Sequence, residues 1–222
     1  MPRRRAAGTG AMITLHGYWR STASWRVRIA LGLKDLPYRQ VTHDLRTGEQ
    51  RLGAFADLSP QGLVPAIEAN GTILTQSLAI IEWLEEQWPE PRLLPNDPAG
   101  RAIVRAMSQI IACDIHPLNN LRVLTELRAQ LGFDEAKVKD WIARWTRAGL
   151  AALEVLVARH GGLFAYGEAP GMADCCLVPQ LFAAERFEVD VSDFPHLLAV
   201  ADRARQLDAF SRAIPAVQPD AD

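Results

Sequence analysis

The stretch RSTASWRVRIAL, residues 20–31, gathers hydroxyls and cations at a point where a strand is expected to turn into a helix. Ser21 and Thr22 fall at this turn, directly after Arg20. The first N–H groups of a helix have no partner within the helix and carry a partial positive charge. A hydroxyl held among them can donate a hydrogen bond to a thiolate and so lower the pKa of a bound thiol, or it can only cap the helix. The turn therefore indicates an anion site, with a plain helix cap as the alternative.

Two more candidate binding positions lie further along the chain. Gln76 and Ser77 stand where a second amphipathic helix begins, and a helix start with a hydroxyl as its N-cap is another place for an anion. Pro65 follows Val64 just ahead of an apolar run. Proline cannot donate to a central strand ladder, so this pair marks a special backbone position, and we expect a cis peptide there. A plain proline at the entry of a strand is the alternative.

A histidine stands within a long apolar segment of the C-terminal half. His116 comes directly before Pro117, which should kink a helix, and Asn120 is four residues on and shares the same helical face. The pair could bind a ligand, although a lone histidine on such a face is more often a core residue with its hydrogen bonds satisfied. No carboxylate, His or Cys partner has the spacing of a metal site, so we expect no metal ion.

The elements that must position these residues follow the order βαβαββα up to residue 87. Helical spacing puts Val27, Ala30 and Leu31 on one face of the first helix, and Asn70–Gly71 is a two-residue hairpin signal. The expected elements, in chain order, are a strand over 12–17, a helix over 21–33, a strand over 38–44, a weak helix or irregular segment over 46–58, two strands within 64–77 and a helix over 77–87. This order predicts a small mixed sheet with a parallel pair, a hairpin and helices on its faces.

The composition changes abruptly after residue 87. Residues 88–98, WPEPRLLPNDP, contain four prolines in eleven positions, which neither a helix nor a central strand tolerates, and they predict a linker. Strand signals then disappear, and residues 99–222 are expected to form an all-helical domain, with helices over 99–131, 134–160, 172–187 and 194–206. The α/β domain would be 12–87. Residues 1–11 are expected to be a disordered leader, because Met12 could equally be a start.

The overall composition narrows the classes of function. Of the 222 residues, 49% are hydrophobic and 23% are charged, and the net charge of −2 gives no electrostatic reason to expect a nucleic-acid partner. No apolar run reaches the length of a membrane-spanning helix, so no membrane partner is expected. The cysteines form no disulfide framework and no CxxC motif. Cys113, Cys175 and Cys176 are therefore expected to be buried free thiols in a reducing cytoplasm.

Taken together, the βαβαββα unit, the proline-rich linker and the helical C-terminal half resemble the glutathione S-transferases. The motifs SxxSWRVRIAL, LVPAIE, TQSLAIIEWLEE and ADCCLVPQLFAAERFEVD are similar to those of the zeta class, which includes maleylacetoacetate and maleylpyruvate isomerases. CDIHPLNN resembles the bacterial maleylpyruvate isomerases in particular. The resemblance covers Met12 to the C-terminus. It implies a thioredoxin-like α/β N-terminal domain, an all-α C-terminal domain, glutathione as cofactor and a homodimer.

The resemblance also implies roles for the residues above. Ser21 would donate a hydrogen bond to the glutathione thiolate, with Thr22 as its neighbour. Many zeta members have Cys where this chain has Ala23, so a protein thiol cannot be the nucleophile here and the thiol must come with glutathione. The other implied glutathione contacts are the backbone at Val64–Pro65, the carboxylate site at Gln76 and Ser77, Gln50 at the glycyl end, and His116 and Asn120, which would touch glutathione or substrate.

Two arginines would hold the substrate, because the substrates that the resemblance implies carry a carboxylate at each end. The planar guanidinium of arginine grips a carboxylate at two points. Arg20 precedes the thiolate turn and Arg186 ends the helix in AERFEVD, so both are expected to bind substrate and Arg20 to assist catalysis. Plain surface arginines are the alternative. Arg26 and Arg28 are expected to be ordinary salt-bridging or snorkelling residues.

The expected activity is a glutathione-dependent cis–trans isomerisation in aromatic-compound catabolism. A maleyl keto acid, maleylpyruvate or maleylacetoacetate, would be converted to its fumaryl form by covalent catalysis, and glutathione would not be consumed. Two alternatives stay open. One is a glutathione-dependent dehalogenase or transferase of the same class, which consumes glutathione. The other is a non-catalytic interaction module with a glutathione-transferase-like fold.

Overall fold

The computed structural model describes residues 12–222, so the predicted leader over residues 1–11 lies outside the described residues. A four-stranded sheet lies near the start of this part of the chain, formed by β1 (Ile13–Gly17), β2 (Tyr38–Thr42), β3 (Ala66–Ala69) and β4 (Thr72–Thr75). The strand order is β2-β1-β3-β4, with β2 parallel to β1, and with β3 antiparallel to both β1 and β4. The mixed sheet that the sequence predicted is therefore confirmed.

Local backbone chemistry explains the hairpin in this sheet. Asn70 and Gly71 join β3 to β4 with φ values of 53° and 75°. A two-residue hairpin turn needs two consecutive residues with positive φ, and asparagine followed by glycine adopts them at low cost. The predicted turn is confirmed at these two residues.

Aromatic side chains hold the segment between β2 and β3 against the sheet. It contains a 3-10 turn over Glu49–Arg51 and the short helix α2 (Gly53–Leu58). Phe55 of α2 stacks on His43, with ring centroids 4.0 Å apart, and His43 Nε2 lies 2.9 Å from His16 Nδ1 in β1. These contacts fix α2 and the turn before it relative to β1.

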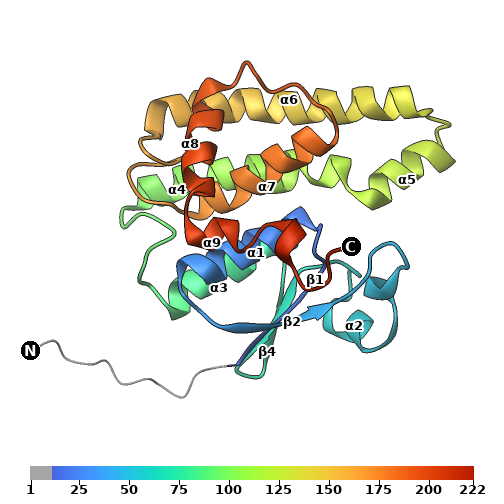
Figure 1. The fold of residues 1–222 in the computed structure, drawn as a ribbon, viewed down its shortest axis with the longest axis horizontal. Helices are drawn as coiled ribbons and strands as arrows, with labels where there is room; N and C mark the ends of the chain where they lie inside the picture. Colours follow the sequence, from blue (N-terminus) through green and yellow to red (C-terminus); the bar gives the residue numbers. More distant parts are fainter. Residues whose placement is uncertain (1–11) are drawn as a thin grey trace, which may run out of the picture.

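Helices α1 (Thr22–Leu33) and α3 (Ser77–Gln87) lie between the sheet and the C-terminal helices, as Figure 1 shows. Every residue of α1 from Ala23 to Leu31 is buried because the helix is covered on both sides. The predicted roles of Arg26 and Arg28 as salt-bridging or snorkelling residues are therefore wrong. Their side chains are only 2% and 1% exposed.

The C-terminal half is all-helical, as predicted. Its helices are α4 (Pro98–Gln109), α5 (Leu121–Ala129), α6 (Glu135–His160), α7 (Met172–Arg186), α8 (Pro195–Arg205) and the short α9 (Asp208–Ser211), which was not predicted. The helix expected over 99–131, with a kink at Pro117, is interrupted rather than only kinked. After α4 the chain passes through a π-helical turn over Ile110–Ile115 and a 3-10 turn over Pro117–Asn119, and α5 then begins. Pro117 has no N–H to continue the hydrogen-bond ladder, so the helix ends there.

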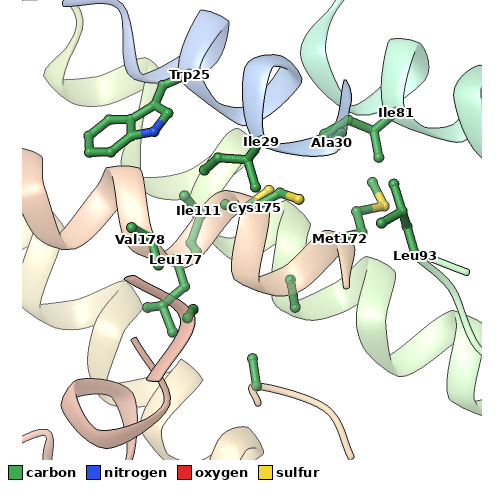
Figure 2. Packing of buried hydrophobic residues seen from close by; sticks show 14 of the residues in the cluster. Trp25, Ile29, Ala30, Ile81, Leu93, Ile111, Met172, Cys175, Leu177 and Val178 are labelled. Atoms are coloured by element: carbon green, nitrogen blue, oxygen red, sulfur yellow. The ribbon is translucent and has the colours of Figure 1, made fainter. Parts of the chain in front are cut away.

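One hydrophobic core joins the two halves of the chain. It includes residues of the sheet, of α1 and of the C-terminal helices, and Figure 2 shows Trp25 and Ile29 of α1 facing Cys175 and Val178 of α7. The predicted linker contains no helix or strand over residues 88–97. Because the core crosses this boundary, the division into two domains stays a prediction. Of all the helices within residues 12–222, none has the length and apolar character needed to cross a bilayer.

The cysteines differ in their exposure. Cys175 and Cys176 of α7 are buried free thiols, as predicted. Cys113 is also a free thiol, but it is exposed, so the prediction of burial is wrong for this residue. It belongs to the π-helical turn, in which Ile111 and Ile115 are the buried residues.

Candidate functional site

Ser21 forms the start of α1. It is the N-cap, in an extended conformation, and its Oγ accepts a hydrogen bond from the backbone N–H of Ser24 at 3.2 Å. Accepting a hydrogen bond uses a lone pair of the hydroxyl and leaves its hydrogen available. Within residues 12–222 this hydroxyl makes no other hydrogen bond. Ser21 can therefore cap the helix and donate to an anion at the same time, so the two interpretations of the sequence are compatible.

Thr22, next to Ser21, connects the turn to the C-terminal half. Its Oγ1 lies 3.0 Å from Nδ1 of His116, which directly follows the π-helical turn. Burial, and after it the positive charges of Arg26 and Arg122, lower the pKa of His116 to about 3. The imidazole is therefore neutral near pH 7 and shares a hydrogen bond with Thr22 without carrying a charge.

The start of α3 forms a second polar site. Gln76 is the N-cap and Ser77 the first helical residue, so the prediction that Ser77 caps this helix is wrong. Gln76 has a strained φ of 69°, and its Nε2 donates to Oε1 of Gln61 at 2.6 Å. Ser77 Oγ accepts a hydrogen bond from Nη1 of Arg26 at 3.2 Å. Since no described side chain caps α3, its first N–H groups are left for an anion.

Two other predicted contacts also lie in the N-terminal half. The peptide bond between Val64 and Pro65, just before β3, is cis, as predicted. Gln50 is buried in the 3-10 turn ahead of α2, and its Oε1 has no hydrogen-bond partner among residues 12–222. A buried polar atom without a partner is unusual in a folded protein, so this atom is suited to a ligand.

Known proteins share this sequence and architecture. The family model described as "Glutathione S-transferase, N-terminal domain" matches residues 15–92. A maleylpyruvate isomerase from Ralstonia sp is 49% identical over 208 residues, which are 93% of this chain and 98% of that protein. A holo structure of a maleylpyruvate isomerase, described as a bacterial glutathione S-transferase in the zeta class, is 48% identical with a TM-score of 0.91, over 94% of this chain and 100% of that one. The chain belongs to the zeta class of glutathione S-transferases.

A second solved structure shows a related protein with the cofactor bound. It is a maleylacetoacetate isomerase from Anaeromyxobacter dehalogenans 2CP-1 with glutathione in its active site, 41% identical with a TM-score of 0.87, over 96% of this chain and 99% of that one. The polar groups of this transferase are suited to the same cofactor. They are the available hydroxyl hydrogen of Ser21, the uncapped start of α3 and the Gln50 Oε1 that lacks a partner in the described chain.

The two arginines predicted to bind substrate lie near enough for the charge of Arg20 to affect Arg186. Arg20 precedes the α1 turn, and Arg186 is the last residue of α7. Although the Arg186 side chain is exposed, partial burial of its guanidinium, and then the charge of Arg20, lower its pKa. Each guanidinium lies over a neighbouring ring, Arg20 at 5.2 Å from the centroid of Trp19 and Arg186 at 4.5 Å from that of Phe187. Neither pairs with a carboxylate in the described part of the chain.

Asn120 does not share a helical face with His116, so that prediction is wrong. The chain turns at Pro117, and Asn120 becomes the N-cap of α5, where its Oδ1 accepts the N–H of Val123 at 3.3 Å. A capping side chain is partly committed to its own helix. The predicted contact of Asn120 with glutathione or substrate stays a prediction. Among residues 12–222 no three His, Cys, Asp or Glu side chains form a group that could hold a metal ion.

Sequence reasoning missed Gly149 of α6, which lies close to the residue before His116. A Cβ at this position would lie 2.5 Å from Cδ1 of Ile115, the residue directly before His116. Glycine therefore allows the π-helical turn to pack closely against α6. The signal in the sequence was a glycine inside a long helix, where it costs about 1 kcal/mol relative to alanine and so needs a packing reason.

Proposed function

We propose that this protein isomerises a short maleyl keto acid, maleylpyruvate or maleylacetoacetate, from the cis to the trans form with glutathione as cofactor. One observation carries the proposal. The hydroxyl of Ser21 stands at the start of α1 with its hydrogen available, in a chain 49% identical to a maleylpyruvate isomerase over 93% of its length. The three free cysteines support a location in the cytoplasm, where thiols stay reduced.

The residues at the α1 turn favour the ionised form of a thiol. Bound glutathione supplies a thiol that adds to the conjugated double bond and leaves again, so that the bond can rotate in between. A free thiol has a pKa near ~8.5 and is only slightly ionised at neutral pH. Ser21 donates a hydrogen bond to the thiolate, and the N–H groups at the start of α1 add partial positive charge. Ala23 provides no competing protein thiol at this turn.

The other site residues orient the two ligands. Ser77 and the N–H groups of α3 hold the γ-glutamyl carboxylate. Gln50 Oε1, which no described residue bonds, accepts a hydrogen bond from the glycyl N–H of glutathione. Arg20 and Arg186 hold the two carboxylates of the substrate. The neutral imidazole of His116, hydrogen-bonded to Thr22, lines the site and adds no charge to it.

We expect isomerisation to require glutathione without consuming it. The purified protein should be incubated with each cis keto acid and glutathione, while absorbance reports the trans product and a thiol reagent reports free glutathione. Substrate should convert completely, with the concentration of free thiol unchanged. S-methylglutathione is the matched control, because it occupies the same site with a blocked sulfur and should support no conversion.

Other outcomes of this experiment would identify the alternative functions. Loss of one thiol for each product formed would contradict the isomerase proposal and favour the transferase or dehalogenase. Retention of the protein on immobilised glutathione, with neither substrate converted, would favour the non-catalytic module.

We also propose that the protein is a homodimer. A cavity of about 450 Å³ opens between α3 and α4, with Leu78, Trp83 and Met172 among its lining residues. A partly apolar surface of this kind gains from cover by a second copy. Light scattering at micromolar concentration should give about twice the chain mass of 24.5 kDa. A mass near that of one chain would contradict the proposal.

A further inference from the structure

Arg26 of α1 is a buried cation with most of its hydrogen-bonding capacity unused. Its side chain is 2% exposed, and its Nη1 donates to Ser77 Oγ. Nε and Nη2 are buried and have no hydrogen-bond partner among residues 12–222. No carboxylate in the described part of the chain forms an ion pair with it. An arginine stays protonated in proteins, and a buried charge without a partner destabilises the fold.

Arg28, two residues further along α1, shows that a buried arginine in this helix can have its hydrogen bonds satisfied. It is 1% exposed, but its Nε donates to the carbonyl of Ala213 at 3.1 Å and its Nη2 to that of Trp19 at 2.9 Å. Arg28 therefore ties the C-terminal segment to the α1 turn. Arg26 lacks comparable partners in the described chain, so its charge is available to a ligand.

The position of Arg26 connects two parts of the glutathione site. It lies one helical turn after Thr22, on the same face of α1. Thr22 contacts His116 on the side of the C-terminal helices, and Arg26 contacts Ser77 at the start of α3. The charge of Arg26 also contributes, after burial, to the lowered pKa of His116. Its electrostatic influence therefore reaches both sides of the site.

The contact with Arg26 determines how the hydroxyl of Ser77 can act. Ser77 Oγ accepts a hydrogen bond from the guanidinium, so an oxygen lone pair is already used. The hydroxyl hydrogen is left to donate, and no residue within 12–222 accepts it. The first N–H groups of α3 lack a capping side chain in the described structure as well. The Ser77 hydroxyl, the first N–H groups of α3 and the positive charge of Arg26 therefore all favour a negatively charged ligand.

We propose that Arg26 is a positioning residue that orients the Ser77 hydroxyl toward the γ-glutamyl carboxylate of glutathione and supplies the positive charge that this carboxylate neutralises. The inference rests on the proposed function in taking glutathione as the ligand. Arg26 acts through Ser77 and through its electrostatic field, and it does not need to touch the carboxylate. Binding then places a negative charge near a buried positive charge that has no ion-pair partner in the described chain, which favours an anion at this point.

Calorimetry with two peptides tests this role. The first peptide is glutathione, and the second is 4-aminobutyryl-cysteinyl-glycine, which is glutathione without the carboxylate in question. Arg26→Met should weaken binding of glutathione by roughly 10- to 100-fold, as expected for loss of a charge-assisted interaction. The wild type and Arg26→Met should bind the shortened peptide with affinities within a few-fold of each other.

Stability supplies a second readout that a merely structural residue would not give. Without ligand, Arg26→Met should unfold at the same temperature as the wild type or higher, because an apolar chain of similar length replaces an unpaired buried charge. Arg26→Lys keeps the charge and should retain more glutathione affinity than Arg26→Met. Arg28→Met is the matched control. It should lower the unfolding temperature, because the carbonyls of Ala213 and Trp19 lose their hydrogen-bond donors. Any change in binding affinity should be the same for the two peptides.

Several results would overturn the inference. They are unchanged glutathione affinity in Arg26→Met, an equal loss for both peptides, or a variant that is less stable or fails to fold. A wild type that binds and isomerises normally while Arg26→Met binds glutathione equally well would reject this inference and leave the proposed function intact. A wild type that does not bind glutathione would reject both.

Discussion

The Ser21→Ala variant is expected to isomerise its substrate roughly 10- to 100-fold more slowly than the wild type at neutral pH. The variant loses the hydroxyl of the N-cap of α1, whose hydrogen is available in the described structure. A hydrogen bond to a charged group contributes about 1.5–3 kcal/mol, and each ~1.4 kcal/mol changes a rate tenfold. Steady-state kinetics at saturating glutathione measures the loss directly.

A glycine variant separates the two roles of Ser21. Alanine at an N-cap costs about 1 kcal/mol of stability, whereas glycine costs only a few tenths, and both lack the hydroxyl. Ser21→Gly should therefore be as slow as Ser21→Ala while unfolding at nearly the wild-type temperature. Both variants should recover activity at alkaline pH, where a thiol of pKa ~8.5 ionises without help. Full activity of Ser21→Ala at neutral pH would show that Thr22 or a backbone N–H stabilises the thiolate instead.

Features set by local chemistry were predictable from the sequence. Asn70–Gly71 specifies its hairpin through backbone conformation alone, and the hydroxyl of Ser21 occupies the N-cap because serine is favoured there. The cis peptide before Pro65 also agrees with the sequence-based expectation. The hairpin and the helix cap depend on neighbouring residues only, so a single sequence contains the information needed to predict them.

Features set by tertiary contacts were not predictable. Arginine is usually a surface residue. Arg26 and Arg28 are buried because other elements cover α1 on both sides. The break between His116 and Asn120 follows from Pro117, but the π-helical turn before it depends on the close approach of α6 at Gly149. Helical periodicity describes one helix at a time and cannot report such contacts.

The Arg186→Ala variant is expected to raise the KM for substrate roughly 10- to 100-fold with little change in kcat. A guanidinium that holds a carboxylate throughout the reaction contributes uniform binding, and losing a charge-assisted pair removes about 1.5–3 kcal/mol. Arg20→Ala should raise KM similarly and also lower kcat. Arg20 stands beside the α1 turn, where its charge can stabilise the negative charge that develops on the substrate. Steady-state kinetics with the cis keto acid would measure both constants.

Because Arg20 and Arg186 both carry positive charge, we expect the proposed substrate site to prefer a dianion. The charge of Arg20 contributes to the lowered pKa of Arg186, and no described carboxylate pairs with either side chain. A substrate with two carboxylates balances these two charges, so removing either arginine should not lower the unfolding temperature of the free protein. Arg205, which is exposed and pairs with Asp202 at 2.9 Å, offers a matched control whose replacement by alanine should leave KM unchanged. Calorimetry should give glutathione affinities within a few-fold of the wild type for both site variants. If either one abolishes glutathione binding while its KM for substrate stays normal, the two binding sites have been assigned the wrong way round.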